Sequence, residues 1–414
     1  MTPFTELTAF AGLDWAGDHH DLVVVDRSGT RLESLRFDHT AAAWKTILER
    51  LRELGSPAIA IETTHGVAVQ QFLDAGLTVY PVVPKAAARY RGRKAPSGVK
   101  DDQLDAWSLA DALRVDGHGW QPLPPHDPMV SELRLLCADE VEFISQRTAL
   151  INQLQAALRE YYPEVLEAFD NWTAPSAWRF ILSFPTPQAL ASAGKRKWEK
   201  FLHANKLWRP ATRDGRLAVF ARAGTFSGSS AATAAKSLLA VSLVKMLLTV
   251  EAQLVIYRAR IEKLFGDHPQ SGLFGSLPGS GPKLGPRLLS LVLHRVEEGV
   301  DSAGLQSLAG TAPVTVKSGQ STRHKLRRNC DKALRCTVHL WANLSRKECV
   351  WAETYYKAHR AKGQSHSCAL RNLGQRWLKI LFQMCLKGEL YDEARHTRNQ
   401  AKHGSWVLAL NPTS

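Results

Sequence analysis

The order of hydrophobic segments in the first 115 residues is the feature that most constrains the fold. Three strand-like segments separated by turn residues come first, at residues 7–15, 21–26 and 31–38. Helical and strand-like periodicities then alternate over residues 41–54, 58–62, 67–75, 77–83 and 102–113, and residues 85–100 predict a basic loop. Three consecutive strands followed by alternating helices and strands predict a mixed sheet with helices on both faces.

This is the element order of ribonuclease H, and it ends at a proline-rich joint, residues 121–128. Beyond the joint, apolar residues at helical spacing predict two long helices, over residues 131–161 and 236–265. We expect these two helices to pair in antiparallel fashion. Residues 223–235 are rich in Gly, Ser and Ala, which favours a loop or linker.

The last third begins with a Pro-Gly-Ser-Gly-Pro turn, residues 278–282, that leads into an apolar helix. Such a turn is typical of a helix-hairpin-helix element, whose glycines let backbone amides approach a phosphate. From residue 305 onward the pattern predicts basic helices. We therefore expect three domains: an α/β domain (1–120), an all-α coiled-coil and oligomerisation region (127–268), and a mostly helical C-terminal domain (270–405).

Positive charge is concentrated in the last third of the chain. The 414 residues contain 53 Lys and Arg against 39 Asp and Glu, a formal net charge of +14. Residues 1–126 carry −3, residues 127–270 carry +4, and residues 271–414 carry +13. A domain this basic favours a polyanionic partner, of which nucleic acid is the commonest. A surface made basic for solubility remains the alternative.

Several protein classes are disfavoured by the sequence. No run of about 18 uncharged apolar residues is present, so we expect no membrane span. The first ten residues lack the pattern of a signal peptide. The six cysteines are far apart with no CxxC pair, which favours a reducing cytoplasm over a disulfide scaffold. Cys330, Cys336 and His339 do not have the spacing of a zinc site.

Four acidic residues are placed so that the predicted fold brings them together. Asp14 ends the first strand and Glu62 ends the fourth, and these strands are neighbours in a ribonuclease H sheet. Asp102 and Asp105 share one face of the helix that packs across the ends of those strands. Clustered carboxylates repel one another unless a hard cation neutralises them, so the four predict a Mg²⁺ or Mn²⁺ site. We interpret the neighbouring acids as surface residues: Asp18, Asp21, Asp101 and Asp111.

Ser318 lies in a Gly-flanked loop that runs directly into a basic cluster, residues 323–328. A serine hydroxyl among cations can attack a phosphodiester, because the cations stabilise the charge gained in the transition state. The same pattern fits an N-cap or a phosphate-contacting hydroxyl, and Thr315 and Ser321 compete for the nucleophilic role. The cations expected to contact nucleic acid are Arg91, Arg93, Lys94, Lys100, Lys283, Lys317, Arg323, Lys325, Arg327 and Arg328.

Together these motifs resemble the DEDD transposases of the IS110 insertion-sequence family. The resemblance rests on residues 12–14 and 61–66 around the first two acids, and on residues 100–106, where Asp101 replaces the usual Thr. It extends through the turn at 278–282 and residues 308–313 to Ser318 and Gly319. Residues 147–154 also resemble the family's helical linker.

The resemblance implies a RuvC-like domain, a coiled-coil region and a C-terminal transposase domain. It implies that Asp14, Glu62, Asp102 and Asp105 bind Mg²⁺, and that Ser318 forms a phosphoserine link to DNA. It also implies a homo-oligomer, dimeric or tetrameric on DNA, in a bacterial cytoplasm and associated with the nucleoid. Some family members are guided by a non-coding bridge RNA that pairs with target and donor DNA, so a guide RNA is an expected partner.

Two other functions remain open from the residues alone. A metal-dependent, structure-selective nuclease resembling a junction resolvase would use water as the nucleophile and leave no protein adduct. A non-catalytic nucleic-acid-binding protein would leave its acidic residues solvated. The acidic cluster and Ser318 are the features that separate these readings from a transposase.

Overall fold

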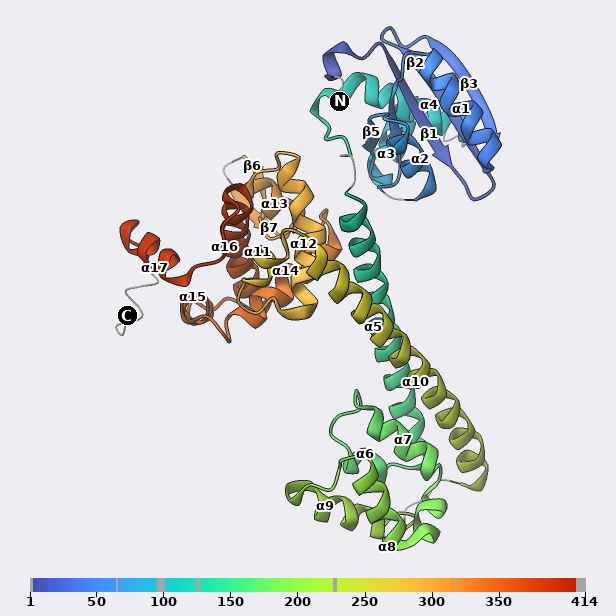
Figure 1. The fold of residues 1–414 in the computed structure, drawn as a ribbon, viewed down its shortest axis with the longest axis vertical. Coiled ribbons are helices and arrows are strands. Elements are labelled where there is room, and N and C mark those ends of the chain that lie inside the picture. The colour runs from blue at the N-terminus through green and yellow to red at the C-terminus, as the bar shows by residue number, and fades with distance from the viewer. Residues whose placement is uncertain are drawn as a thin grey trace. The chain divides into compact units, whose positions relative to one another are not determined.

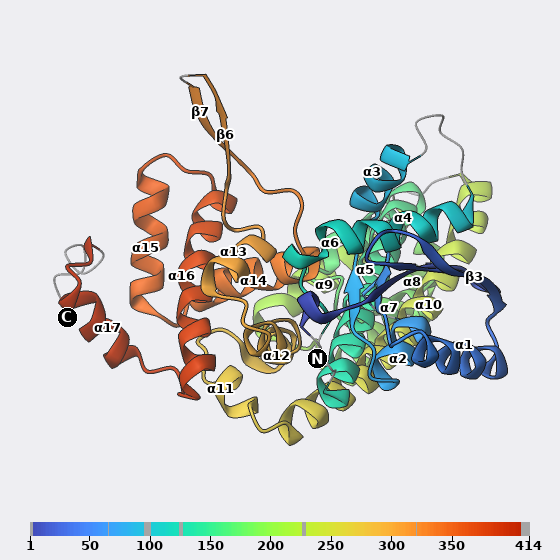
Figure 2. The same ribbon diagram turned by 90° about the horizontal axis from the view of Figure 1, so that it is seen from above.

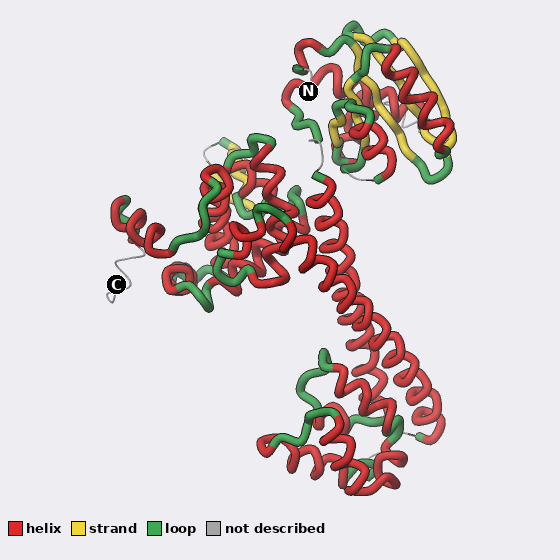
Figure 3. The backbone as a smooth tube through the Cα atoms, viewed as in Figure 1, coloured by secondary structure: helices red, strands yellow, loops and turns green. Residues whose placement is uncertain are grey.

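The computed structural model describes residues 3–64, 66–94, 101–123, 127–225, 229–319 and 321–406. The chain divides into two compact units, residues 1–127 and 128–414. Strands lie in the first unit and in one hairpin of the second, and the other described elements are helices (Figure 3). Each unit is described by itself below.

A five-stranded mixed sheet forms the centre of the first unit (Figure 1). Its strand order is β3-β2-β1-β4-β5, with β1 antiparallel to β2 and parallel to β4. The strands are β1 (Ala9–Trp15), β2 (His19–Asp26), β3 (Arg31–Asp38), β4 (Ala58–Ile61) and β5 (Val79–Pro81). This confirms the predicted fold class, including the adjacency of the first and fourth strands.

Helices cover both faces of this sheet. On one face, apolar residues of α1 (Ala41–Glu53) and α2 (Val67–Asp74) pack on the strands. On the other face, α3 (Pro84–Lys94) and α4 (Asp102–Asp116) do the same. The prediction of a loop over residues 85–100 is therefore wrong for residues 85–94, because Ala87 anchors a helical turn in the core. The rest of that segment, 95–100, lies outside the described residues.

Two long helices, α5 (Pro128–Tyr161) and α10 (Ser230–Asp267), pair along their length in the second unit. Their ion pairs fix the direction: Lys236 with Glu160, Arg147 with Glu251, Arg258 with Glu140, and Arg260 with Glu132. Residue numbers rise on one helix as they fall on the other, so the pair is antiparallel, as predicted. The predicted linker over 223–235 is too long, since α10 already begins at Ser230 with Ser229 as its N-cap.

Helix α10 is, among the described residues, the helix long and apolar enough to cross a membrane by length and composition. Its most apolar 18-residue window has a mean hydropathy of 1.9 and is 28% buried. Lys245 and Glu251 interrupt the apolar run, and Glu251 is paired with Arg147 of α5. In this fold α10 serves as one helix of an antiparallel pair.

A helical cap joins α5 to α10 and has a core of its own. It consists of α6 (Glu164–Ala168), α7 (Pro175–Ser183), α8 (Pro187–Ala204) and α9 (Pro210–Ala221). Its core is aromatic, and Trp178, Phe180 and Phe220 are almost fully buried. Residues 150–158 of α5 and 240–247 of α10 complete this core, so the cap is built onto the helix pair.

The C-terminal part packs around a second core, to which the other ends of α5 and α10 contribute. Its helices are α11 (Ser271–Gly275), α12 (Gly281–Glu297), α13 (Ser302–Leu308), α14 (Lys332–Ser345), α15 (Val350–Ala361), α16 (His366–Lys387) and α17 (Glu393–Lys402). A two-stranded hairpin, β6 (Val314–Ser318) and β7 (Ser321–Lys325), extends from it (Figure 2). The expected loop around Ser318 is thus a hairpin, and all six cysteines are free.

Candidate functional site

Three acidic side chains gather at one edge of the sheet. Asp14, near the end of β1, lies directly opposite Asp21 of β2 in the strand register. Leu13 pairs with Ile61 of the parallel strand β4, so the residues that follow them, Asp14 within β1 and Glu62 just after β4, lie side by side. Asp21 is 1% exposed, which corrects its interpretation as a surface residue. Its position was predictable from the short turn between the strands, which sets the pairing.

Helix α4 contributes Asp102 and Asp105 from its first turn. Asp105 is buried, whereas Asp102 is half-buried. Asp101 occupies the N-cap position but makes no side-chain cap hydrogen bond, and its carbonyl accepts the Asp105 amide at 2.9 Å. Asp111, further along the helix, is also buried and pairs with Arg114 at 2.6 Å, so it is not the surface residue expected from the sequence.

The electrostatics of Asp14 show that the predicted acids lie close enough to interact. Burial raises the pKa of Asp14 from 3.8 to about 6, and the charges of Asp105, Asp102, Glu62 and Asp21 add to the rise. Each of those carboxylates makes the ionised form of Asp14 less favourable. The cluster therefore has excess negative potential, which a bound cation would relieve.

Two arginines partly neutralise the cluster. Arg91 of α3 forms an ion pair of 2.6 Å with Asp105. Arg36 of β3 donates to Asp21 at 2.8 Å and to Asp102 at 3.2 Å. One oxygen of Asp105, Oδ1, is buried without a hydrogen-bond partner in the described part of the chain. A buried carboxylate oxygen without a partner is costly, and it is a suitable ligand for a hard cation.

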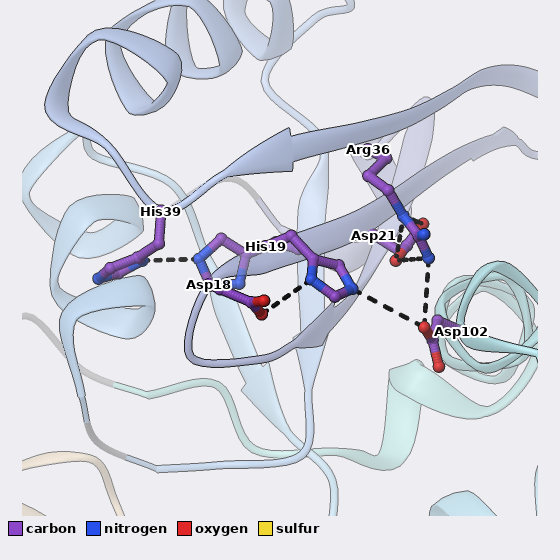
Figure 4. Close-up of polar contacts among 7 residues, drawn as sticks. Asp18, His19, Asp21, Arg36, His39 and Asp102 are labelled. Atoms are coloured by element: carbon purple, nitrogen blue, oxygen red, sulfur yellow. Dashed lines mark hydrogen bonds and ion pairs between the residues drawn. The ribbon is translucent and has the colours of Figure 1, made fainter.

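A second ligand group overlaps the first. His19, Asp21 and Asp102 each offer one ligand atom, and these atoms lie within 4.8 Å of one another (Figure 4). His19 also contacts Asp18 at 2.8 Å, and its other ring nitrogen lies 3.9 Å from Asp102. The sequence interpretation missed His19. Its signal was its place two residues before Asp21, which puts both on one face of β2.

The donor set fits a divalent cation. Carboxylate oxygens dominate it, as hard cations such as Mg²⁺ and Mn²⁺ require, and one imidazole lies at its edge. The acids come from four different elements, β1, β2, the end of β4 and α4, so the fold and not a local motif assembles them. The arrangement is suited to binding a phosphodiester through a metal.

The hairpin in the second unit places Ser318 at its tip. Ser318 is the last residue of β6 and pairs with Ser321 across a turn in which Gly319 has φ +55°. The next pair on the same face is Val316 with Arg323, followed by Val314 with Lys325. The exposed Ser318 hydroxyl therefore shares its face with two cations, Arg323 and Lys325.

The opposite face of the hairpin carries a different set of side chains. Thr315 lies there with Lys317, and the Thr315 hydroxyl forms a 3.2 Å hydrogen bond with Nδ1 of His324. Ser321 and Thr315 were the alternatives to Ser318 as nucleophile. Ser321 is the cross-strand partner of Ser318, and Thr315 lies on the opposite face.

The other cations expected to contact nucleic acid occupy varied positions. Arg93, Lys283 and Arg328 are exposed. Arg327 is half-buried at the base of the hairpin. Its guanidinium donates to the Ala312 carbonyl, and its backbone carbonyl accepts a hydrogen bond from Arg335. The side chain of Lys94 and all of Lys100 lie outside the described residues.

The glycine turn before α12 is closely packed. Gly279 has φ +70°, and its amide donates to Glu348 at 2.7 Å. The indole of Trp341 donates to the Pro278 carbonyl at 2.9 Å. The turn is thus anchored on α14 and on the residues that follow α14. The Gly279 amide is hydrogen-bonded to Glu348, so in this structure it does not point to a free phosphate-binding position.

Two family models match the chain. Residues 11–163, which hold the acidic cluster, match a model described as a transposase, of the DEDD type named for IS110. Residues 271–357, which hold the hairpin, match one described as the transposase IS116/IS110/IS902 family. The chain is also 32% identical over 410 residues to the "Mini-circle putative transposase for IS117" of Streptomyces coelicolor, an alignment that covers 94% of this chain and 96% of the relative. The chain belongs to the IS110 family of transposases.

Two proteins of insertion elements are similar over nearly the same length. The "Insertion element IS900 uncharacterized 42 kDa protein" of Mycobacterium paratuberculosis is 28% identical, over 94% of this chain and 98% of its own. The "Insertion element IS116 uncharacterized 44.8 kDa protein" of Streptomyces clavuligerus is 26% identical, over 93% and 96%. Membership of this family makes the protein a transposase that binds DNA, and its DEDD-type domain indicates dependence on a divalent metal.

Proposed function

We propose that this transposase excises and inserts its own insertion sequence with Ser318 as a covalent nucleophile. The observation that carries the proposal is the hairpin register, which puts Ser318 at an exposed tip on the same face as Arg323 and Lys325. An exposed hydroxyl beside two cations can reach a DNA phosphate, and the cations stabilise the charge that develops on it.

In the proposed step, Ser318 Oγ attacks a phosphorus atom of the DNA backbone. A phosphorus–Oγ bond forms while the bond from phosphorus to the leaving sugar oxygen breaks. The serine loses its proton, and the leaving sugar oxygen gains one. Because the phosphodiester bond is exchanged and not hydrolysed, a sugar hydroxyl of another strand can reverse the step and rejoin DNA without ATP.

Asp14, Glu62, Asp102 and Asp105 are proposed to hold Mg²⁺, or Mn²⁺ in its place. Such a metal would stabilise negative charge on the phosphate and leaving oxygens during displacement. Asp21 and His19 lie near enough to support the same site. Without the cation, Arg91 pairs with Asp105 and Arg36 pairs with Asp21, so these arginines balance part of the negative charge.

The remaining parts of the proposal concern organisation and partners. We assign residues 1–120 to metal chemistry, 127–268 to oligomerisation through the helix pair, and 270–405 to the serine chemistry. Resemblance to guided family members supports a non-coding RNA as a partner, and the net charge of +13 on residues 271–414 is compatible with holding one. We further propose that the protein acts at the nucleoid, where a DNA substrate would be found.

Strand exchange on a supercoiled plasmid that carries the element tests this function. The wild type should excise the element with Mg²⁺ present and fail with EDTA, and Ser318→Ala should abolish excision. Retained excision by Ser318→Ala would overturn the serine assignment. Metal-dependent cleavage that yields free ends, unchanged by Ser318→Ala, would instead identify a junction-resolvase-like nuclease.

A further inference from the structure

The helical cap carries a cationic surface in a segment that neither family model covers. The first model ends at residue 163, and the second begins at residue 271. Between residues 164 and 229, ten Lys and Arg stand against five Asp and Glu. Most of these cations are exposed, and several are consecutive in the second half of α8.

The second half of α8 is a separate helical segment with a clear division of faces. Gly194, with φ +72°, breaks the helix, so residues 195–204 run in a new direction. Trp198 and Leu202 anchor this segment in the cap core, and the Trp198 indole donates to the Leu190 carbonyl at 2.8 Å. The buried side is therefore fixed, and the side chains on the opposite side face solvent.

Arg196, Lys197, Lys200 and His203 make up that exposed side. At 100° per residue, all four fall within about a third of the helix circumference. Within residues 195–204 the acidic side chain is Glu199, which is half-buried at the border of this face, about 40° from His203, and lies 4.0 Å from Lys195. A solvated helix face usually mixes charges of both signs, and this one does not.

The basic face ends on an aromatic pair. The His203 ring stacks on Trp208, with centroids 4.4 Å apart and planes 23° apart. The Arg213 guanidinium covers the Trp208 ring at 5.5 Å. This stack fixes the end of the helical segment that carries the face.

The basic face lies at the far end of the helix pair from the C-terminal core (Figure 1). Helix α10, which joins the two, has 38 residues, a length of about 57 Å. That exceeds one turn of duplex, about 34 Å. A nucleic acid held at both ends of the helix pair would thus be held at two separate places along its length.

We propose that Arg196, Lys197 and Lys200 form a contact to the phosphate backbone of a nucleic acid, separate from the hairpin. The exposed face offers cations and one imidazole but no Asn, Gln or carboxylate that would read base edges. The contact is therefore independent of base sequence, and its role is to position the nucleic acid relative to the helix pair. It does not depend on the chemistry assigned to Ser318.

The test removes these three charges in the full-length protein. The variant combines Arg196→Gln, Lys197→Gln and Lys200→Gln. Its matched control combines Arg159→Gln, Arg179→Gln and Lys245→Gln, three exposed cations scattered over the same unit. Affinity is measured by fluorescence anisotropy on a 40-base-pair DNA duplex and on an RNA hairpin, over a range of salt concentrations.

The face variant should lose about tenfold in affinity or more for at least one of the two probes. Its plot of log K against log salt should be shallower by about 2 to 3, as expected for two or three lost phosphate contacts. The probe that responds identifies the source as DNA or RNA. The proposal is overturned if the face variant loses no more affinity than the scattered control on both probes.

Discussion

Gly12 of β1 lies against the backbone of Ala106 in α4. A Cβ atom built on Gly12 would stand 2.0 Å from the Ala106 carbonyl oxygen and 2.5 Å from the Ala110 amide nitrogen. Because Gly12 lacks a side chain, α4 packs closely across the strand that carries Asp14. This contact is what brings Asp102 and Asp105 to the acidic cluster.

Gly12→Ala should push α4 away from the sheet. We expect a loss of about 1–3 kcal/mol in the free energy of unfolding, as overpacked cores show, together with weaker Mg²⁺ binding. Urea unfolding and a Mg²⁺ titration measure the two effects. Gly17→Ala is the control, because a Cβ there meets no atom within 4 Å. Unchanged metal affinity in Gly12→Ala would show that the approach of α4 does not set the site.

The raised pKa of Asp14 predicts a pH dependence in the metal-free protein. Between about pH 4 and about pH 6 the folded protein retains a proton that the unfolded chain has released, because the folded pKa is about 6 against 3.8. The free energy of unfolding should therefore fall as the pH rises through this window. Asp14→Asn should show a flatter profile in EDTA, and Mg²⁺ should restore stability to the wild type near pH 7. Identical profiles for the two proteins would contradict the electrostatic account.

Glu140 joins the helix pair to the C-terminal core through a buried ion cluster. It is 2% exposed and accepts from Arg287 at 2.6 Å and from Arg258 at 3.0 Å. Burial raises its pKa, but these two arginines outweigh that and hold the pKa below its ordinary value. Glu140→Gln leaves the buried Arg287 charge without its carboxylate, so we expect a loss of about 3–5 kcal/mol in unfolding free energy. The control, Glu142→Gln at an exposed site, should change the free energy of unfolding by less than about 0.5 kcal/mol. Urea unfolding measures both variants, and equal losses would contradict a stabilising role for the buried ion cluster.

The two faces of the hairpin predict different effects for two neighbouring cations. Arg323 shares the Ser318 face, whereas Lys317 points to the other. At saturating DNA, Arg323→Gln should slow formation of the serine–DNA link by about 100-fold, the usual cost of removing one transition-state donor. Lys317→Gln should mainly weaken DNA binding. Single-turnover kinetics separate the two, and equal rates for both variants would mean that the hairpin face does not matter.

The sequence predicted those parts of the fold that repeat a local pattern. Alternation and helical spacing located the sheet, α5 and α10, whereas Asp21 was interpreted as a surface residue although the strand register places it opposite Asp14. The helix α3 was missed because its cations obscured Ala87, the buried residue among its described side chains, which packs in the core. The hairpin was missed because both of its strands are exposed, so neither has an alternating apolar face.

The four acids of the candidate site were predictable from the order of strands and helices. The arginines that pair with them were not. Asp14, Glu62, Asp102 and Asp105 follow from element order alone. The ion pairs of Arg36 and Arg91 depend on how β3 and α3 pack beside them, and no spacing along the chain encodes those distances. Arginines compensate the charges of the buried Asp21 and Asp111, and the sequence interpretation missed both partners.

The central claim is that Ser318 becomes covalently bound to DNA, and mass spectrometry of the trapped complex tests it most directly. The protein is incubated with DNA carrying the element ends and Mg²⁺, denatured, digested with nuclease and protease, and searched for a nucleotide-linked peptide. Ser321→Ala, at the cross-strand neighbour, serves as the control. We predict a nucleotide on Ser318 in the wild type and in Ser321→Ala, and none in Ser318→Ala. A linked nucleotide on another residue, or active strand exchange without any linked peptide, would contradict the account.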